Sequence, residues 1–277
     1  MISLFFTNFA IQKIIEMKKE NLLQKYGAYA VALVLFVAIA YIYCSPVLDG
    51  KVIQSGDNTS ATAAVQEAVQ YTKDTGDHSF WTGSMFSGMP NYQIGGGHYE
   101  ANDWLKPFRK IMLKGHWSAP WVFIIFFVCF YILMRAFSIN KWLSIVGALA
   151  TGFSSYFFII VQAGHNSKTS SIALISVVVA GFYLIFRKKY GWGVILTMLF
   201  TAIGFGNHPQ MSYYLFMMIG LFFIAELYIH IKEKCYKDLA IGSVLFFGSL
   251  LVGLGTGSST IFVNQEYAEQ TMRGGHS

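Results

Sequence analysis

Long apolar runs separated by short polar stretches dominate the pattern of this chain. Most runs approach the length of about 20 residues at which a helix crosses the hydrocarbon of a bilayer. The pattern therefore predicts seven membrane-spanning helices. They lie near residues 28–44, 119–138, 142–162, 170–186, 193–206, 211–231 and 239–257. The fifth run is short and carries Gly204 and Gly206, so we expect a tilted or broken helix there, and a miscount would invert the orientation of every later span.

Lysine and arginine placement predicts how these helices are oriented. Short cytoplasmic loops of membrane proteins carry an excess of both residues. With the N-terminus inside, the inner segments hold Lys13, Lys18, Lys19, Lys25, Arg135, Lys141, Arg187, Lys188, Lys189, Lys232, Lys234 and Lys237. The short outer segments hold only Lys168 and Arg273. We therefore expect a cytoplasmic N-terminal segment, residues 1–27, of which residues 1–16 precede a second plausible start site at Met17.

Composition agrees with this assignment to the all-α, polytopic membrane proteins. The chain is 55% hydrophobic and only 12% charged, whereas soluble domains are about 25% charged. The net charge of +6 is explained by membrane orientation, and no compact Lys/Arg stripe indicates a nucleic-acid partner. The three cysteines, Cys44, Cys129 and Cys235, fall at different predicted depths, so we expect no disulfide.

A long first outer loop, residues 45–118, separates the first two predicted spans. Residues 45–60 are turn-rich, and residues 61–72 have helical propensity. Further along, helical spacing gathers one apolar face and one basic face. The apolar face holds Trp104, Leu105, Phe108, Ile111 and Met112, and the basic face holds Lys106, Arg109, Lys110 and Lys114. The pattern predicts an interfacial helix in the headgroup plane, and a sharper interpretation is that Arg109 and Lys110 hold a lipid phosphate.

Polar residues that could carry chemistry gather in the predicted outer segments. They are Asp57, His165, Asn166, Asn207, His208, Gln210, Asn264, Gln265 and Glu266. The inner loops are plain basic connectors, so function is expected outside. Because imidazole titrates near pH 6.5 and can donate or accept, His165 and His208 could bind a divalent metal ion or a phosphate oxygen. The alternative is that both histidines merely cap helix ends, and their spacing is not a metal signature.

Several stretches together resemble one known family. They are YIYCSPVLDGKVIQSGD, FWTGSMFSGMPNYQ, FSSYFFIIVQAGHNSK, GNHPQMSYYLF and EYAEQTMRGG. They resemble the YfhO-type bacterial membrane proteins, which are grouped with the GT-C class of glycosyltransferases, and the resemblance covers nearly all of residues 17–277. It implies a multi-pass protein of the bacterial plasma membrane with a catalytic acid shortly after the first span. It also implies a polyprenyl-phosphate sugar as donor and a cell-envelope glycan as acceptor.

The resemblance assigns roles to particular residues. The catalytic general base maps to Asp57, with Asp49 as the alternative. The residues expected to bind the donor phosphate are His165, Asn166, Lys168, His208, Arg109 and Lys110. Many GT-C enzymes carry an acidic motif in the second outer loop, but AGHNSK has no carboxylate, which leaves His165 and Asn166 as its substitutes. Family members are longer than this chain, so we expect residues 258–277 to be a truncated outer segment.

Two other classes of function remain open at this stage. A transporter or flippase of lipid-linked sugars would use the same outer polar cluster as a vestibule, although transporters usually place ionisable residues near the bilayer midplane. A non-catalytic membrane scaffold would need none of these polar residues individually. Motifs of soluble enzymes, such as a phosphate-binding glycine loop or a zinc-protease helix, are absent from the sequence.

Overall fold

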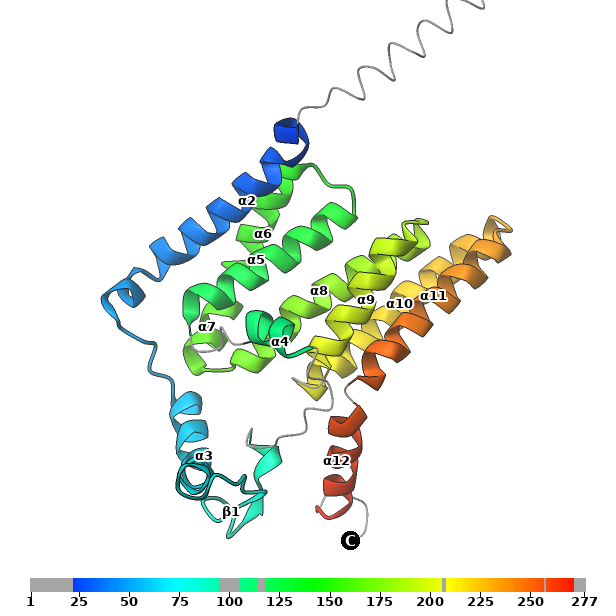
Figure 1. Ribbon diagram of the computed structural model, residues 1–277. Helices are drawn as coiled ribbons and strands as arrows, with labels where there is room; N and C mark the ends of the chain where they lie inside the picture. Colours follow the sequence, from blue (N-terminus) through cyan, green and yellow to red (C-terminus); the bar gives the residue numbers. More distant parts are fainter. Residues whose placement is uncertain (1–21, 95–104, 114–117, 206–207, 257, 272–277) are drawn as a thin grey trace, which may run out of the picture.

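Helices dominate the structure, a computed structural model that describes residues 22–94, 105–113, 118–205, 208–256 and 258–271 (Figure 1). The helices are α2 (Leu22–Tyr43), α3 (Gly56–Thr75), α4 (Lys106–Leu113), α5 (Ala119–Ala136), α6 (Lys141–Gly152), α7 (Ser155–Ala163), α8 (Asn166–Phe186), α9 (Tyr190–Gly204), α10 (Pro209–Lys232), α11 (Tyr236–Gly255) and α12 (Ser258–Glu269). Short 3₁₀ turns, η1 (Ser45–Asp49) and η2 (Asn91–Gln93), and one small hairpin, β1 (Trp81–Thr82) and β2 (Met89–Pro90), complete the described elements. The predicted all-α class is confirmed.

Five of these helices are long and apolar enough to cross a membrane, which makes the chain a multi-pass membrane protein. The five spans are Tyr26–Tyr43, Ala119–Ala136, Ser167–Phe186, Gln210–Lys232 and Tyr236–Gly255. A sixth span is possible if α6 and α7 act as one. The predicted count of seven is not reached, because the fifth apolar run forms α9, a helix of only 15 residues.

The run predicted as a single span at 142–162 is broken in two. Helices α6 and α7 meet at a bend of 50°. The break falls at Gly152, Phe153 and Ser154, where α6 ends and Ser154 takes an extended conformation before α7 begins. Gly/Ser pairs are among the usual causes of sharp helix kinks. The aromatic ring of Phe153 packs against Phe127 of α5, with ring centroids 5.2 Å apart, so this bend is part of the hydrophobic core.

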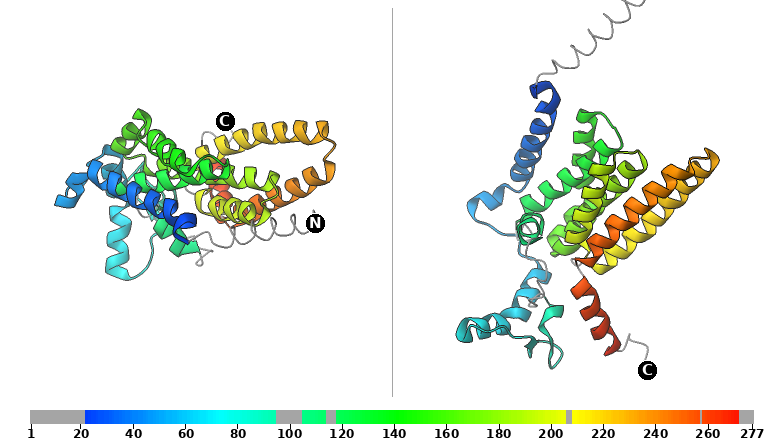
Figure 2. Two further views of the ribbon diagram at one scale, coloured as in Figure 1. Left: turned by 90° about the horizontal axis from the view of Figure 1, so that it is seen from above. Right: turned by 45° about the vertical axis from the view of Figure 1, so that its right-hand side comes forward.

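Helix α8 is the centre of the bundle. Within the described residues, 83% of its spanning window is buried, compared with 22% for α10 and 28% for α11. Figure 2 shows α10 and α11 as an antiparallel pair at one side. Two glycines let α8 and α9 approach closely. A Cβ on Gly193 would lie 2.9 Å from the carbonyl oxygen of Gly181, and a Cβ on Gly253 of α11 would lie 2.8 Å from that of Met198.

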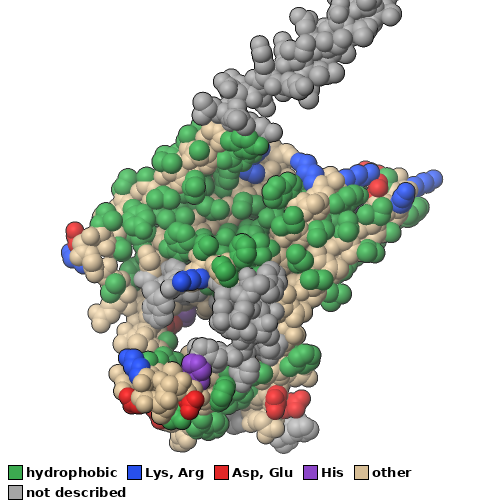
Figure 3. Space-filling view, in the orientation of Figure 1, with side chains coloured by type: hydrophobic (Ala, Val, Ile, Leu, Met, Phe, Trp, Pro, Cys, Tyr) green, Lys and Arg blue, Asp and Glu red, His purple; other side chains and the backbone are tan. Residues whose placement is uncertain are grey.

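Basic residues mark one end of the bundle. The turns α5–α6, α8–α9 and α10–α11 lie at this end, and Figure 3 shows Lys and Arg gathered there above an apolar surface. Two ion pairs join the α8–α9 turn to α10 and α11. Arg187 Nη2 lies 3.0 Å from Glu226 Oε1, and Lys188 Nζ lies 2.7 Å from Asp238 Oδ2. Helices α3 and α12 and the hairpin lie beyond the opposite end (Figures 1 and 2).

The glycine contact between α8 and α9 gives the first prediction. Gly193→Ala places a methyl group against the backbone of α8, so the helices must separate and the free energy of unfolding should fall by about 1–3 kcal/mol. Gly191→Ala is the matched control on the same helix, because its Cβ meets nothing within 4 Å. Thermal unfolding in detergent micelles measures both variants. Equal midpoints for the two would show that α8 and α9 do not approach as closely as described.

Candidate functional site

Asp57 stands in the first turn of α3, not in a loop. The sequence pattern predicted a turn-rich stretch over 45–60 and a helix over 61–72, but α3 begins at Gly56 and runs to Thr75. Ser55, in extended conformation, takes the N-cap position. A carboxylate in the first turn is favoured by the positive end of the helix dipole. The helix start therefore gives Asp57 a defined place on the outer segment.

The turn between α7 and α8 receives the start of α3. Gly164 ends α7 in the left-handed conformation, with a φ of +93°, and His165 takes the N-cap position of α8. A Cβ on Gly164 would lie 2.5 Å from the hydroxyl oxygen of Ser55. Glycine is therefore required twice at this position, once for its backbone angle and once for space. Docking of α3 on this turn brings two distant parts of the chain together.

The result is a direct contact between Asp57 and His165. Their atoms Oδ2 and Nδ1 are 3.1 Å apart, and the side chains are 58% and 50% exposed. In the tautomer that carries its proton on Nδ1, His165 donates a hydrogen bond to the carboxylate. Exposed ion pairs contribute only about 0–1 kcal/mol to stability. The pair is therefore better suited to presenting two accessible polar groups than to holding the fold together.

Two further predicted phosphate-binding residues lie near this pair. Lys168 stands in the first turn of α8, and its Nζ lies 5.6 Å from the centroid of the Tyr156 ring. His208 takes the N-cap position of α10. Burial, followed by the positive charge of Lys168 and then His165, lowers the pKa of His208 below its ordinary value. His208 is therefore neutral at pH 7, and these three side chains share one electrostatic environment.

The other predicted site residues are not brought into this cluster. Asp49, the alternative base, is exposed at the end of η1, and Lys110 is exposed on α4. The side chains of Arg109 and Asn166 lie outside the described part of the chain, although their backbones belong to α4 and α8. No contact with Asp57 or His165 is described for Asp49 or Lys110, so the structure brings Asp57, and not Asp49, to His165.

The metal hypothesis finds no ligand set. Across the described ranges, no group of three or more His, Cys, Asp or Glu side chains could hold a metal ion. His165 and His208 together with Asp57 do not form such a group. The divalent ion considered for His165 and His208 therefore stays a prediction.

The predicted amphipathic helix forms over Lys106–Leu113, as α4. Leu105 is fully buried just before α4, while Phe108 and Ile111 are 45% and 54% exposed. Trp121 of α5 donates a hydrogen bond from Nε1 to the carbonyl oxygen of Ile111, at 2.8 Å. The predicted residues Trp104 and Lys114 lie outside the described residues. Helix α4 is thus fastened to α5 and leaves apolar side chains exposed beside the bundle, as a helix resting on lipid would.

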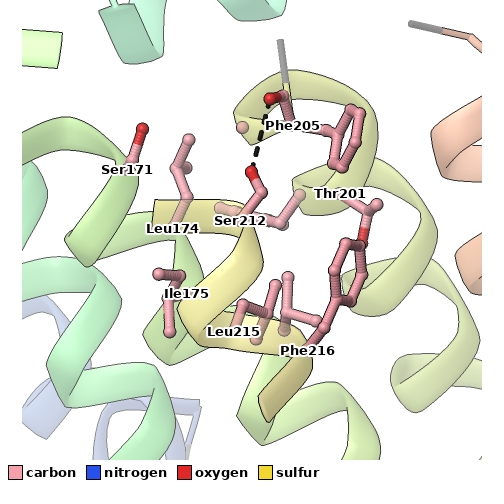
Figure 4. Close-up of a pocket in the computed structure, with 11 residues that line it drawn as sticks. Ser171, Leu174, Ile175, Thr201, Phe205, Ser212, Leu215 and Phe216 are labelled. Atoms are coloured by element: carbon pink, nitrogen blue, oxygen red, sulfur yellow. Dashed lines mark hydrogen bonds between the residues drawn. The ribbon is translucent and has the colours of Figure 1, made fainter. Parts of the chain in front are cut away.

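A small cavity between three helices is too narrow for a lipid tail. It lies between α8, α9 and α10 and is lined by Leu174, Thr201, Ser212 and Phe216, among others (Figure 4). Ser212 donates a hydrogen bond to the carbonyl oxygen of Phe205, at 3.3 Å. The cavity has a volume of about 20 Å³, which is room for one water molecule.

Glu67 organises the rest of the outer loop, and the sequence analysis did not single it out. Its Oε2 accepts hydrogen bonds from Ser84 Oγ at 2.9 Å, the Gly83 amide at 2.9 Å and Thr82 Oγ1 at 3.1 Å. These bonds hold the pKa of the Glu67 carboxyl below its ordinary value. The only signal in the sequence is the donor-rich tripeptide TGS, which does not say which carboxylate it receives.

A second contact ties the loop to the end of the described chain. Gln93 Nε2 donates to Asn264 Oδ1 of α12 at 2.9 Å, and the rings of Tyr92 and Tyr267 meet edge to face. Asn264 was among the outer polar residues of the sequence analysis. It therefore serves here as an anchor between two outer segments.

Comparisons of this chain with protein-family models, with curated protein sequences and with solved structures found no match. A function can therefore be inferred only from the sequence and from the geometry and chemistry of the site.

The shared environment of Lys168 and His208 gives a prediction about protonation. Lys168→Met removes a positive charge that lowers the pKa of His208, so that pKa should rise toward its ordinary value. NMR titration of the histidine side chains in micelles measures the shift, with His208→Gln identifying the resonance. Lys189→Met, at the opposite end of the bundle, is the control and should leave the titration unchanged. Identical curves for both lysine variants would contradict the described proximity.

The Glu67 contacts predict how the hairpin responds to pH. Because the folded pKa of Glu67 is lowered, its stabilisation is complete above the ordinary pKa and is lost as pH falls through the lowered value. Glu67→Gln should weaken the hairpin at neutral pH and remove most of this pH dependence. Hydrogen exchange of the Gly83 amide measures it, and Asp77→Asn is the exposed carboxylate control. The measured quantity is the protection factor, which is the intrinsic exchange rate at each pH divided by the observed rate. A protection factor of the Gly83 amide that does not change with pH in the wild type would contradict the role of Glu67.

Proposed function

We propose that this chain belongs to a membrane glycosyltransferase that transfers a sugar from a polyprenyl-phosphate donor to a cell-envelope acceptor outside the bacterial plasma membrane. The observation that carries the proposal is the contact of 3.1 Å between Asp57 and His165. It joins the predicted base, 108 positions earlier in the chain, to the turn expected to receive the phosphate. Both groups are accessible, and a cationic side chain lies one turn further along α8.

The proposed reaction consists of three events, and the chain's side chains assist two of them. An acceptor hydroxyl attacks the anomeric carbon, the bond from that carbon to the phosphate oxygen breaks, and the hydroxyl proton leaves. Asp57 accepts this proton as general base, and His165 holds the carboxylate in position. Negative charge develops on the departing polyprenyl phosphate, and Lys168 is the cation that offsets it. His208, neutral at pH 7, contributes a hydrogen bond and not a charge.

The membrane topology of the proposal is the one that the lysines and arginines indicate. The N-terminus and the basic turns lie in the cytoplasm, seven segments cross or enter the membrane, and the long first loop lies outside, as in GT-C proteins. Support comes from the alternation of the connections, since the basic turns share one end and the candidate site lies at the other. The short α9 is the segment on which the count depends.

A transporter of lipid-linked sugars is the second candidate, and one observation favours it. Glu226 is buried in α10 and lines a cavity of about 310 Å³ between α5, α8 and α10. Ionisable residues inside spans often mark transport pathways. However, Glu226 is paired with Arg187 and with His230, so its carboxylate is already neutralised. The glycosyltransferase is preferred because its proposed groups are accessible.

Donor consumption tests the proposed reaction. The protein is reconstituted in liposomes with a radiolabelled polyprenyl-phosphate sugar, and loss of label from the lipid is followed. Asp57→Asn removes the base with little change of shape and should reduce the rate by about 10²-fold or more. Asp49→Asn, which changes the alternative carboxylate, should match the wild type.

Four outcomes would contradict the assignment in different ways. Equal rates for Asp57→Asn and wild type would exclude Asp57 as the base. Loss of activity in Asp49→Asn alone would transfer that role to Asp49. If wild-type protein consumes no donor but moves labelled lipid across the bilayer, the transporter becomes the preferred function. If it neither consumes donor nor moves lipid, a non-catalytic scaffold becomes the preferred function.

A further inference from the structure

A hollow is lined by residues that flank Asp57 in the sequence, and it has no role in the reaction as described so far. It is formed between the extended segment 52–55 and the first turns of α3, and its volume is about 470 Å³. Pockets that bind small molecules are typically about 300–1,000 Å³. The hollow is therefore large enough for a ligand, unlike the cavity between α8, α9 and α10.

One face of α3 supplies most of the polar lining. Asn58, Thr62 and Gln66 follow one another at intervals of four residues, which places them on the same side of the helix. Thr59 lies next to them, and Gln54 faces them from the extended segment. Thr62 and Gln66 are exposed to solvent. The pattern is a row of amide and hydroxyl groups along a concave surface.

The hydrogen-bonding state of these groups favours a ligand with hydroxyls. The hydroxyls of Thr59 and Thr62 donate to the carbonyl oxygens of Ser55 and Asn58, at 3.0 and 2.8 Å. Their oxygens therefore keep lone pairs that accept from a ligand. Side-chain amides such as Gln66 both donate and accept, as sugar hydroxyls do. Ser55 also lines the hollow, but its buried Oγ lies against Gly164 and is not available to a ligand there.

The absence of charged side chains in the lining of the hollow and the apolar surface of one wall further restrict the class of ligand that fits. None of the side chains that line it is charged, so nothing there pairs with a phosphate or a carboxylate. Asp57, the next residue before Asn58, adds a negative charge nearby that disfavours anions. Val52 and Ile53, 78% and 44% exposed, give one wall an apolar surface. Such a wall suits the C–H face of a sugar ring, whose hydroxyls project around its edge.

We propose that this hollow binds the acceptor as a neutral saccharide and directs one of its hydroxyls toward Asp57. The proposal rests on the proposed glycosyltransferase function and adds that the bound part of the acceptor is uncharged, together with the surface that recognises it. The donor phosphate belongs to the cationic side, at Lys168 and the start of α8. The neutral acceptor belongs to α3, and Asp57 stands between the two.

Equilibrium binding tests the hollow without relying on catalysis. The probes are methyl glycosides of glucose, galactose, mannose and N-acetylglucosamine, with methyl glucuronide as the charged comparison, each added to the protein in micelles and measured by saturation-transfer NMR. At least one neutral glycoside should bind, and more tightly than the glucuronide. Gln66→Leu should weaken binding by about tenfold, because it removes an amide that both donates and accepts.

Matched variants separate this proposal from the proposed reaction. Gln70→Leu makes the same change one turn further along α3, outside the hollow, and should bind like wild type. Binding of none of the neutral glycosides, or equal binding by Gln66→Leu and Gln70→Leu, overturns the saccharide site even if donor is consumed. Selective loss in Gln66→Leu with no donor consumption keeps the saccharide site and rejects the transferase.

Discussion

Close packing of α8 against α9 is the constraint on which the rest of the structure depends. Gly181 and Gly193 allow two helix backbones to approach closely, and α5 packs against α8 on another side. Because α8 is fixed on several sides, the turn that precedes it is fixed as well. His165 and Lys168 stand at this end of α8, so their position is set by helix packing within the bundle. A rigid element of this kind is what a precise polar site needs.

The second half of the site is held in a different way. Asp57 comes from a helix outside the bundle, which reaches the α7–α8 turn through the fit of Ser55 against Gly164. That contact involves two small residues, whereas the glycine-mediated packing of α8 is part of a large core. Further contacts restrain the outer segment, since Glu67 closes the hairpin and Gln93 reaches α12. One member of the Asp57–His165 pair is therefore built into the bundle, and the other is carried by a segment outside the bundle with its own supports.

Sequence patterns predicted the long apolar helices well, because burial in lipid requires a continuous apolar stretch that needs no knowledge of partners. They failed where tertiary contacts decide the outcome. The bend at Gly152 depends on where Phe153 packs. Helix α9 ends at Gly204 after only 15 residues. The start of α3 at Gly56 was missed because Gly, Asp and Asn also favour turns. The sequence analysis placed Asp57 and His165 on one side of the membrane, but no periodicity could predict their contact across 108 positions. Glu67 was missed for the same reason, since its donors lie 15 to 17 residues away.

The ion pair between Arg187 and Glu226 has a consequence for how the protein is made. A carboxylate within a span costs about 2.5–3.5 kcal/mol at mid-helix on insertion scales, and less toward the ends. Arg187 precedes Glu226 by 39 residues, so the ribosome completes α8 and its cation before α10 emerges. The growing chain thus has the counter-charge ready when the acidic helix leaves the translocon. Order of synthesis, as well as final packing, therefore eases entry of α10 into the bilayer.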